Sequence, residues 1–169
     1  MSERATELTT PRLRMRRARA DDLPAIHAIM SDAETMRYWS TPPHETLEQT
    51  RAWLDGMLAT DPAEGDEFVL EQDGQLIGKL GAWRLPEIGF FLRRDRWGQG
   101  LAAEALGAYI RYIAGRGARC LTADVDPRNA GSLALLMRAG FFETGRASGT
   151  YEIGGRLCDS VYLRLDLGG

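Results

Sequence analysis

Long apolar segments are missing from this chain of 169 residues, and cysteine is scarce. No hydrophobic run approaches the roughly 20 residues needed to cross a bilayer, and the first residues lack the apolar stretch of a secretory signal. We therefore expect a cytoplasmic protein without a membrane partner. The two cysteines, Cys120 and Cys158, lie in strand-like apolar runs with no CxxC or histidine spacing around them. This favours buried free thiols over a disulfide, and we assign no metal site.

Positive charge is also short, because 21 lysine and arginine residues face 24 acidic ones and leave a net charge of −3. A general nucleic-acid binder normally carries a basic surface, so we expect no nucleic-acid partner. The length and the hydrophobic content of 44% suffice for one ordinary core but not for two. We expect a single domain that spans residues 1–169.

Hydrophobic periodicity and turn residues predict a mixed α/β order. Strands are expected over five segments: residues 13–17, 68–70, 76–80, 87–92 and 120–125. Hairpin turns are expected at Asp73-Gly74 and around Gly154-Gly155. Helices are expected over four segments, which begin near Asp21, Thr46, Leu101 and Asn129. Two of these helices are expected to bury apolar stripes, namely Leu47, Leu54, Met57 and Leu58 in the second and Leu133, Leu136 and Met137 in the fourth.

A glycine loop, Trp97-Gly98-Gln99-Gly100-Leu101-Ala102, joins the strand over residues 87–92 to the next helix. Glycine lets the backbone approach a ligand closely, and the unpaired amides at the start of a helix attract anions. An isolated Gly-x-Gly is more often a simple tight turn, but Arg93, Arg94 and Arg96 lie beside this one. Because guanidinium groups bind phosphate well, we interpret the loop as a pyrophosphate site.

The same loop also fits the dinucleotide fingerprint GxGxxA, with Asp124 about 20 residues further on at a strand end. A dinucleotide-binding fold has six parallel strands in two halves. Only 45 residues follow Asp124, and they predict one short helix and a hairpin. A dinucleotide-binding protein is therefore the weaker alternative.

Two further segments place a polar side chain, Asn129 or Glu87, at the start of a predicted helix or strand. Asn129 is a preferred N-cap for the short helix that ends before Phe141. Glu87 follows Pro86 at the start of a strand, where a carboxylate either faces solvent or reaches into a cleft. Taken alone, each of these features has an ordinary structural explanation.

In combination, these segments resemble the GCN5-related N-acetyltransferase (GNAT) superfamily, and more narrowly its RimJ and RimL branch. The likeness covers nearly the whole chain in segments that keep their order: Thr10–Arg16, Asp21-Asp22, Met36–Trp39, Glu87–Phe90, Trp97–Ala105 and Asn129–Phe141. Several motifs in the right order are far more specific than one motif alone.

The resemblance implies a mixed, mostly antiparallel sheet that is split open at its centre and flanked by helices. It also implies that acetyl-coenzyme A (acetyl-CoA) binds in this split. The cofactor contacts implied are from the backbone of Phe91, Leu92 and Arg93 to pantetheine, from the loop Trp97, Gly98, Gln99, Gly100, Leu101 and Ala102 to pyrophosphate, and from Asn129 and Ser132 near the reactive end.

The resemblance also suggests the residues that move protons. Many members carry a tyrosine seven residues after the asparagine as the acid for the leaving thiolate, and here that place is Leu136. The RimL-like branch has a serine three residues after the asparagine, which matches Ser132. Asn129 and Ser132 share one helix face at i, i+3 spacing, so both side chains can line one pocket. We therefore expect Ser132 to act as the acid.

Acetyl transfer needs a neutral amine as nucleophile, so a base is required near neutral pH. Glu87 is the best-placed carboxylate by its motif, and partial burial would raise its pKa towards a useful range. The two histidines compete poorly, because His27 falls within a helix, His44 lies in a proline loop, and neither has a recognisable triad partner.

The acceptor implied is a primary amine, either a protein N-terminal α-amine or a small molecule. The segment between Met36 and Met57 is expected to shape its site. The protein is expected to be a monomer or a homodimer. The non-catalytic alternative is a sensor that binds acyl-CoA with the same loop and catalyses no reaction.

Overall fold

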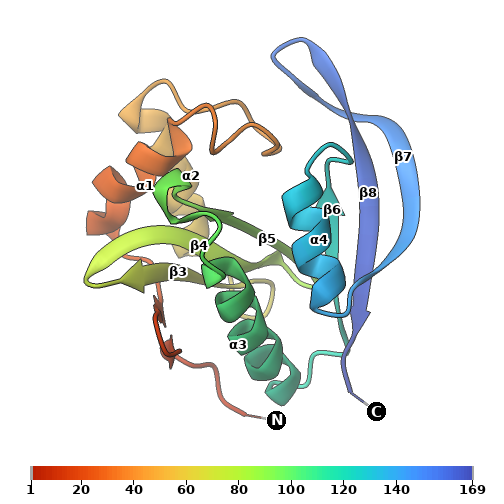
Figure 1. Cartoon of the computed structure of the whole chain (residues 1–169). Coiled ribbons are helices and arrows are strands. Elements are labelled where there is room, and N and C mark those ends of the chain that lie inside the picture. The colour runs from red at the N-terminus through yellow and green to blue at the C-terminus, as the bar shows by residue number, and fades with distance from the viewer. Residues whose placement is uncertain (1, 169) are drawn as a thin grey trace.

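Eight strands form one sheet, in the order β1-β2-β3-β4-β5-β6-β8-β7, in the computed structural model, which describes residues 2–168 (Figure 1). The strands are β1 (Glu7–Thr9), β2 (Arg14–Arg16), β3 (Asp66–Gln72), β4 (Gln75–Arg84), β5 (Glu87–Leu92), β6 (Cys120–Val125), β7 (Phe142–Ile153) and β8 (Arg156–Asp166). The helices are α1 (Leu23–Met30), α2 (Leu47–Ala59), α3 (Leu101–Gly115) and α4 (Ala130–Arg138). Two 3-10 turns, η1 (Ala20–Asp22) and η2 (Arg94–Arg96), precede α1 and α3.

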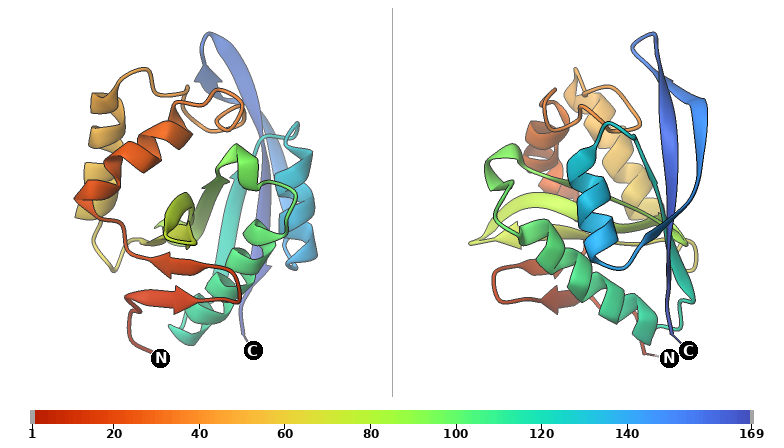
Figure 2. Two further views of the ribbon diagram at one scale, coloured as in Figure 1. Left: turned by 60° about the vertical axis from the view of Figure 1, so that its left-hand side comes forward. Right: turned by 45° about the vertical axis from the view of Figure 1, so that its right-hand side comes forward.

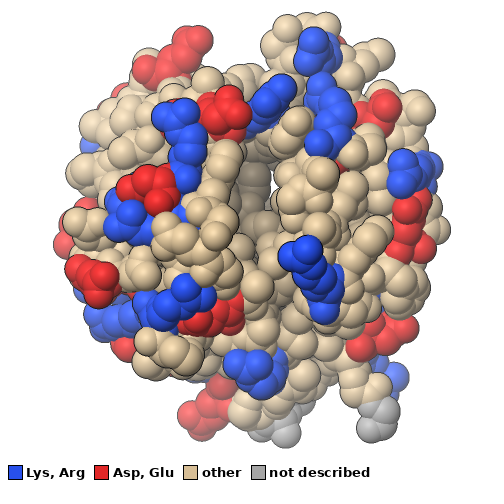
Figure 3. All heavy atoms as spheres, viewed as in Figure 1, with Lys and Arg blue, Asp and Glu red and all other residues tan. Residues whose placement is uncertain are grey.

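The sheet opens between β5 and β6, which run parallel and share a single registered pair, Glu87 and Thr122. At this point the Thr122 amide donates to the Pro86 carbonyl over 2.9 Å. Towards Leu92 no further pair joins the two strands among residues 2–168, so the sheet divides into two halves (Figure 2). The surface is hollowed between these halves (Figure 3). The predicted mixed sheet that splits at its centre is therefore confirmed, because the other neighbouring strands pair antiparallel.

Helices cover both faces of the sheet, and the side chains of β3, β4 and β5 alternate between the two resulting cores. Phe68, Leu80 and Ile88 belong to the core under α3 and α4. Val69 and Phe91 belong to the core under α1 and α2. Figure 2 shows these two helices lying together against the sheet. Strand β5 is thus packed on both faces and bonded to β4 on one edge, so that only its edge towards β6 stays open.

Local sequence signals explain where most elements begin and turn. Asp73 and Gly74 have φ angles of 51° and 77°, as the two-residue turn between β3 and β4 requires. At the start of α2, Thr46 accepts the Gln49 amide while the Gln49 side chain accepts the Thr46 amide over 3.0 Å. The predicted capping box is therefore confirmed.

Three expectations about the elements were wrong. Strand β1 was missed, since it has three residues and pairs only with β2. Leu47 and Leu58 of α2 are 42% and 43% exposed, because the helix buries its Thr50–Leu54 line and these residues lie to one side of it. On α4, Leu136 takes the buried position and Met137, the next residue round the helix, is 49% exposed.

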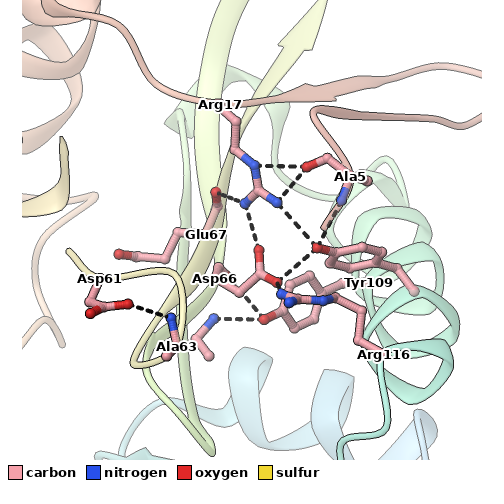
Figure 4. Close-up of polar contacts among 10 residues, drawn as sticks. Ala5, Arg17, Asp61, Ala63, Asp66, Glu67, Tyr109 and Arg116 are labelled. Carbon is pink, nitrogen blue, oxygen red and sulfur yellow. Dashed lines mark hydrogen bonds and ion pairs between the residues drawn. The ribbon is translucent and has the colours of Figure 1, made fainter. Parts of the chain in front are cut away.

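Asp66, at the start of β3, is fully buried and collects charged and aromatic partners (Figure 4). Its carboxylate accepts from Arg17 Nη1 over 2.6 Å, from Arg116 Nη1 over 2.7 Å and from the Tyr112 hydroxyl over 2.8 Å. Its carbonyl accepts from the Tyr109 hydroxyl over 2.7 Å. We call these five residues the Asp66 cluster. The cluster joins the N-terminal segment, β3 and α3 at a place two strands removed from the split.

Candidate active site

The backbone groups of β5 alternate between the closed edge at β4 and the open edge at the split. The Arg93 amide donates to the Ile77 carbonyl over 2.6 Å, and Phe91 pairs with β4 in the same register. Successive residues of a strand direct their backbone groups to opposite sides. Phe91 and Arg93 therefore face β4, whereas Phe90 and Leu92 face the split.

This register corrects the expectation that the backbone of Phe91 and Arg93 is available to a ligand in the split. Of the three expected residues only Leu92 directs its backbone groups into the split, and Phe90, which was not among them, does so as well. The Leu92 carbonyl accepts a hydrogen bond from Trp97 Nε1 over 2.7 Å. The Leu92 amide and both backbone groups of Phe90 have no backbone partner among residues 2–168. An open strand edge of this kind can pair with an extended ligand.

The glycine loop lies directly after this strand. Gly98 and Gly100 have φ angles of 72° and 76°, in the left-handed region where L-residues with a side chain are strained. Gly100 is the N-cap of α3. Six consecutive backbone amides, from Gly98 to Ala103, meet no acceptor in the part of the chain that the structure describes. With the positive end of the α3 dipole behind them, these amides suit a phosphate group.

The arginines beside the loop are already paired with carboxylates. Arg93 and Arg96 both bind Asp95, at nitrogen–oxygen distances of 2.6 and 3.0 Å. Arg94 lies 3.4 Å from an oxygen of Asp32. Three guanidinium groups thus share two carboxylates at the surface, so part of their positive charge is already paired, which weakens the interpretation of these side chains as phosphate ligands. The backbone amides remain as the anion-binding feature.

At the start of α4, Asn129 Oδ1 accepts the Ser132 amide over 3.1 Å, so the predicted cap is confirmed. The cap occupies the amide of Ser132 and leaves its hydroxyl without a hydrogen-bond partner among residues 2–168. Ser132 is half-buried and carries the one hydroxyl of the helix. Leu136, one turn later, is fully buried in the core. On α4, only Ser132 can therefore donate a hydroxyl hydrogen bond to a ligand.

Glu87 pairs with Thr122 at the single registered contact between β5 and β6, and its side chain is half-buried. Trp83 Nε1 donates to its Oε2 over 2.8 Å. Burial raises the pKa of Glu87, the hydrogen bond from Trp83 opposes this shift, and the Asp124 carboxylate on β6 adds to it. The net shift is upward, which brings the carboxyl group closer to proton exchange near neutral pH.

The connection between α1 and α2 reaches across to the β6 side of the molecule. The Arg128 guanidinium, which follows β6, lies 5.5 Å from the centre of the Tyr38 ring. Arg128 also binds Asp126 over 2.6 Å. Burial, together with Asp126 and Asp124, raises the pKa of Tyr151 on β7 to about 12. No sequence motif marks Arg128 or Tyr151, because only the fold brings them together.

The histidines have structural partners. His27 Nδ1 and His44 Nδ1 each lie 2.7 Å from the hydroxyl of the buried Thr50, so both residues help to join α1 to α2. Cys120 and Cys158 are free thiols, of which only Cys158 is buried. No group of three His, Cys, Asp or Glu side chains within residues 2–168 is arranged to hold a metal ion. None of the described helices combines the length and apolar character needed to span a bilayer.

Solved structures share this fold. The chain superposes with a TM-score of 0.84 on an acetyl transferase from Salmonella typhimurium that modifies the N-terminal serine of a 50S ribosomal protein, at 21% identity over 94% of this chain and 97% of that one. It superposes with a TM-score of 0.80 on spermidine N-acetyltransferase from Vibrio cholerae in complex with CoA and spermine, at 20% identity over 93% and 96%. The chain thus shares its fold with these two acetyltransferases.

Sequence comparison defines the family. Residues 12–142 match the acetyltransferase (GNAT) domain. L-methionine sulfoximine/L-methionine sulfone acetyltransferase of Pseudomonas aeruginosa is 30% identical over 167 residues, which cover 90% of this chain and 94% of that protein. The chain belongs to the GNAT family and is an N-acetyltransferase. The dinucleotide-binding alternative is wrong, because β5 and β6 are the one parallel pair in the described sheet.

Proposed function

We propose that this protein transfers the acetyl group of acetyl-CoA to the primary amine of a small acceptor of the amino-acid class. The observation that carries the proposal is the split between β5 and β6. One wall is the open backbone edge of β5. The glycine loop, whose six amides have no acceptor among residues 2–168, follows at one end. An extended arm that contains amide groups and ends in a pyrophosphate is complementary to both features.

In this arrangement the pantetheine arm pairs with Phe90 and Leu92, and the pyrophosphate accepts hydrogen bonds from the amides between Gly98 and Ala103. Trp97, through its hydrogen bond to the Leu92 carbonyl, holds the end of β5 against the loop. The thioester then lies near the start of α4, where Asn129 and Ser132 stand.

The acceptor reaches the thioester from the side of Glu87. Its ammonium form first loses one proton to Glu87, directly or through a water. The amine then attacks the carbonyl carbon, so that a C–N bond forms and the C–S bond breaks. The nitrogen gives its second proton to solvent, and the departing thiolate takes a proton from the Ser132 hydroxyl, which regains one from solvent. The raised pKa of Glu87 supports the first role, and the unpaired hydroxyl of Ser132 supports the second.

The acceptor class is supported by the relative that acts on methionine sulfoximine and methionine sulfone, at 30% identity. Charges at the acceptor end fit such a molecule. Glu87 and Asp124 offer negative charge to an ammonium group. Arg128 binds Asp126 through Nε and Nη2, and its Nη1, which has no hydrogen-bond partner among residues 2–168, can donate to a carboxylate. Tyr38, which stacks on Arg128, would border the same site.

Release of free CoA from acetyl-CoA, measured with a panel of amines, tests this proposal. The panel contains L-methionine sulfone, L-methionine sulfoximine, spermidine and a peptide with an N-terminal serine. We expect amine-dependent release with the highest kcat/KM for the two amino-acid analogues. CoA binding without amine-dependent release would identify a sensor instead. A preference for the peptide would keep the transferase and replace the acceptor class by a protein N-terminus.

Two single variants test whether Arg128 helps to bind the acceptor. Arg128→Ala should raise KM for the amino-acid acceptor without changing KM for acetyl-CoA. Arg138→Ala removes an equal charge from the exposed end of α4 and should change neither constant.

A further inference from the structure

The turn between β1 and β2 is bonded to the glycine loop, although the two lie about 90 residues apart in sequence. Arg12 Nε and the Arg12 amide each donate to the Glu104 carboxylate over 2.9 Å, and Arg12 Nη1 donates to the Gln99 carbonyl over 2.7 Å. The Thr10 hydroxyl donates to the same carboxylate over 2.6 Å. We call Thr10, Arg12, Gln99 and Glu104 the loop clamp.

The bond to Gln99 orients the loop. Gln99 lies between two glycines in the left-handed conformation, so no neighbouring side chain restrains its peptide group. In a planar trans peptide the carbonyl of one residue and the amide of the next point in opposite directions. Because Arg12 holds the Gln99 carbonyl on its own side, the Gly100 amide points away from Arg12. That amide is one of the six without an acceptor among residues 2–168.

The hydrogen bonds to Glu104 keep its carboxylate ionised, and the Arg12 guanidinium neutralises that negative charge. Glu104 lies in the first turn of α3, and its amide donates to the Gly100 carbonyl over 3.1 Å. Burial alone would raise the pKa of Glu104, but the hydrogen bonds from Thr10 and Arg12 outweigh it and the pKa is lowered. The carboxylate is therefore charged at neutral pH, one helical turn from the loop. Without Arg12 it would repel a phosphate bound there.

One nitrogen of Arg12 remains available. Nη2 has no hydrogen-bond partner among the described residues, and it lies 3.4 Å from the position of a Cβ added at Gly100. A charged N–H group thus stands beside the loop on the side opposite to the Gly100 amide, where it adds positive charge close to the anion site.

We propose that Arg12 is a positioning residue of the donor site, which orients the Gln99–Gly100 peptide for the pyrophosphate and neutralises Glu104. This inference rests on the proposed function, since it assumes that acetyl-CoA binds at the loop. It gives the Thr10–Arg16 segment a role in binding that the segment's own position at the sheet edge does not suggest.

Calorimetric titration with CoA tests the clamp. Arg12→Ala should weaken CoA binding by about 10- to 100-fold, the range for hydrogen bonds to charged groups. Arg14→Ala is the matched control, because Arg14 lies on the same N-terminal segment and binds Glu7 and Glu71 instead of the loop. Its CoA affinity should stay within about twofold of wild type. Arg12→Lys keeps the charge but cannot hold Gln99 and Glu104 together, so it should fold normally and lose part of the affinity.

A double variant separates positioning from simple structural support. Arg12→Ala leaves Glu104 charged and unneutralised, so Arg12→Ala/Glu104→Gln should bind CoA more tightly than Arg12→Ala alone. If the clamp only supports the fold, the second substitution removes a further contact and the affinity falls again. The kcat/KM for S-acetylpantetheine, a thioester without the pyrophosphate, should be equal in wild type and Arg12→Ala.

Three results would overturn the inference. Equal CoA affinity of wild type and Arg12→Ala would remove Arg12 from the donor site and leave the proposed function intact. A double variant that binds more weakly than Arg12→Ala would reduce the clamp to structural support. Wild-type protein that does not bind CoA would overturn the proposed function itself, together with this inference.

Discussion

The Asp66 cluster and the split between β5 and β6 differ in how many of their polar groups have a hydrogen-bond partner. In the cluster both carboxylate oxygens are bonded, and the Tyr109 hydroxyl donates to the Asp66 carbonyl and accepts from the Ala82 amide. In the split, the open edge of β5 and six loop amides have no backbone partner among residues 2–168. Native proteins pair nearly all of their polar groups. The cluster leaves one buried side-chain atom without a partner, Arg116 Nε, whereas the unpaired backbone groups of the split are many and lie together. This difference supports the proposal that the split binds a ligand and that the cluster serves stability.

The largest expected effect is on stability and lies in the cluster. Asp66→Asn should lower the free energy of unfolding by about 3–5 kcal/mol, because Arg17 and Arg116 lose their buried anion. Urea unfolding measures this loss. Asp61→Asn, at an exposed aspartate nearby, is the control and should cost less than about 1 kcal/mol. If Asp66→Asn costs no more than Asp61→Asn, the cluster is not a source of stability.

The next effect is on binding and lies in the split. Gly100→Val should weaken CoA binding by about 100-fold or more, roughly 2.7 kcal/mol, because a branched side chain strains the left-handed conformation and occupies space beside the anion site. Gly154→Val, in the β7–β8 turn at a φ of 56° with open surroundings, carries similar strain without that site. Calorimetry should show normal CoA affinity for Gly154→Val, and an equal loss in both variants would assign the effect to strain alone.

Loss of the proposed base should depend on pH. Glu87→Gln should lower kcat/KM by about 100-fold near neutral pH, the lower end of the range for general acid–base catalysis. The loss should shrink as the pH approaches the pKa of the acceptor amine, where free amine no longer needs a base. Glu152→Gln, at an exposed position of β7, is the control. Wild-type activity of Glu87→Gln across the whole pH range would leave Glu87 without a catalytic role.

A smaller effect is expected at the proposed acid. Ser132→Ala should lower kcat by about tenfold, because a thiolate is a fairly good leaving group. KM for acetyl-CoA and thermal stability should both stay unchanged, since the Asn129 cap uses the Ser132 amide and not its hydroxyl. An unchanged kcat would show that the thiolate leaves unaided. Leu136→Tyr is a poor rescue, because Leu136 is fully buried and a larger side chain would overpack the core.

The smallest expected effect is a shift of the pH profile. The hydrogen bond from Trp83 lowers the pKa of Glu87, so Trp83→Phe should raise it further. Because the base works as the carboxylate, the acid limb of kcat/KM should move to higher pH while the maximal value stays close to wild type. A limb that moves to lower pH, or does not move, would separate Glu87 from the titrating base.

Most elements of the fold were predictable from local sequence signals, and each wrong prediction has an identifiable structural cause. Asp73-Gly74 and the Thr46 cap determine turns and helix starts through their own backbone preferences, so they could be identified without tertiary information. Strand β1 has only three residues and no comparable signal. The stripe of α2 was misjudged at Leu47 and Leu58, because the area of sheet under the helix decides how wide the buried face is.

The site was less predictable, because its geometry depends on register and on distant contacts. Whether Leu92 or Phe91 opens to the split follows from the pairing of β5 with β4, which sequence alone does not determine. The bonds of Arg12 to Glu104 and Gln99 join segments that carry no shared motif. Glu87 and Ser132 could be proposed as base and acid only because several motifs together resembled one family.

Residue-resolved amide hydrogen exchange, with and without CoA, tests most directly the claim that the open backbone of the split is the donor site. The account predicts that CoA slows exchange most at Phe90, at Leu92 and at the amides from Gly98 to Ala103. The Ala82 amide, already bonded to Tyr109 in the Asp66 cluster, should change least. If CoA binds and the slowed amides lie elsewhere while the loop amides exchange as before, the split does not hold the donor.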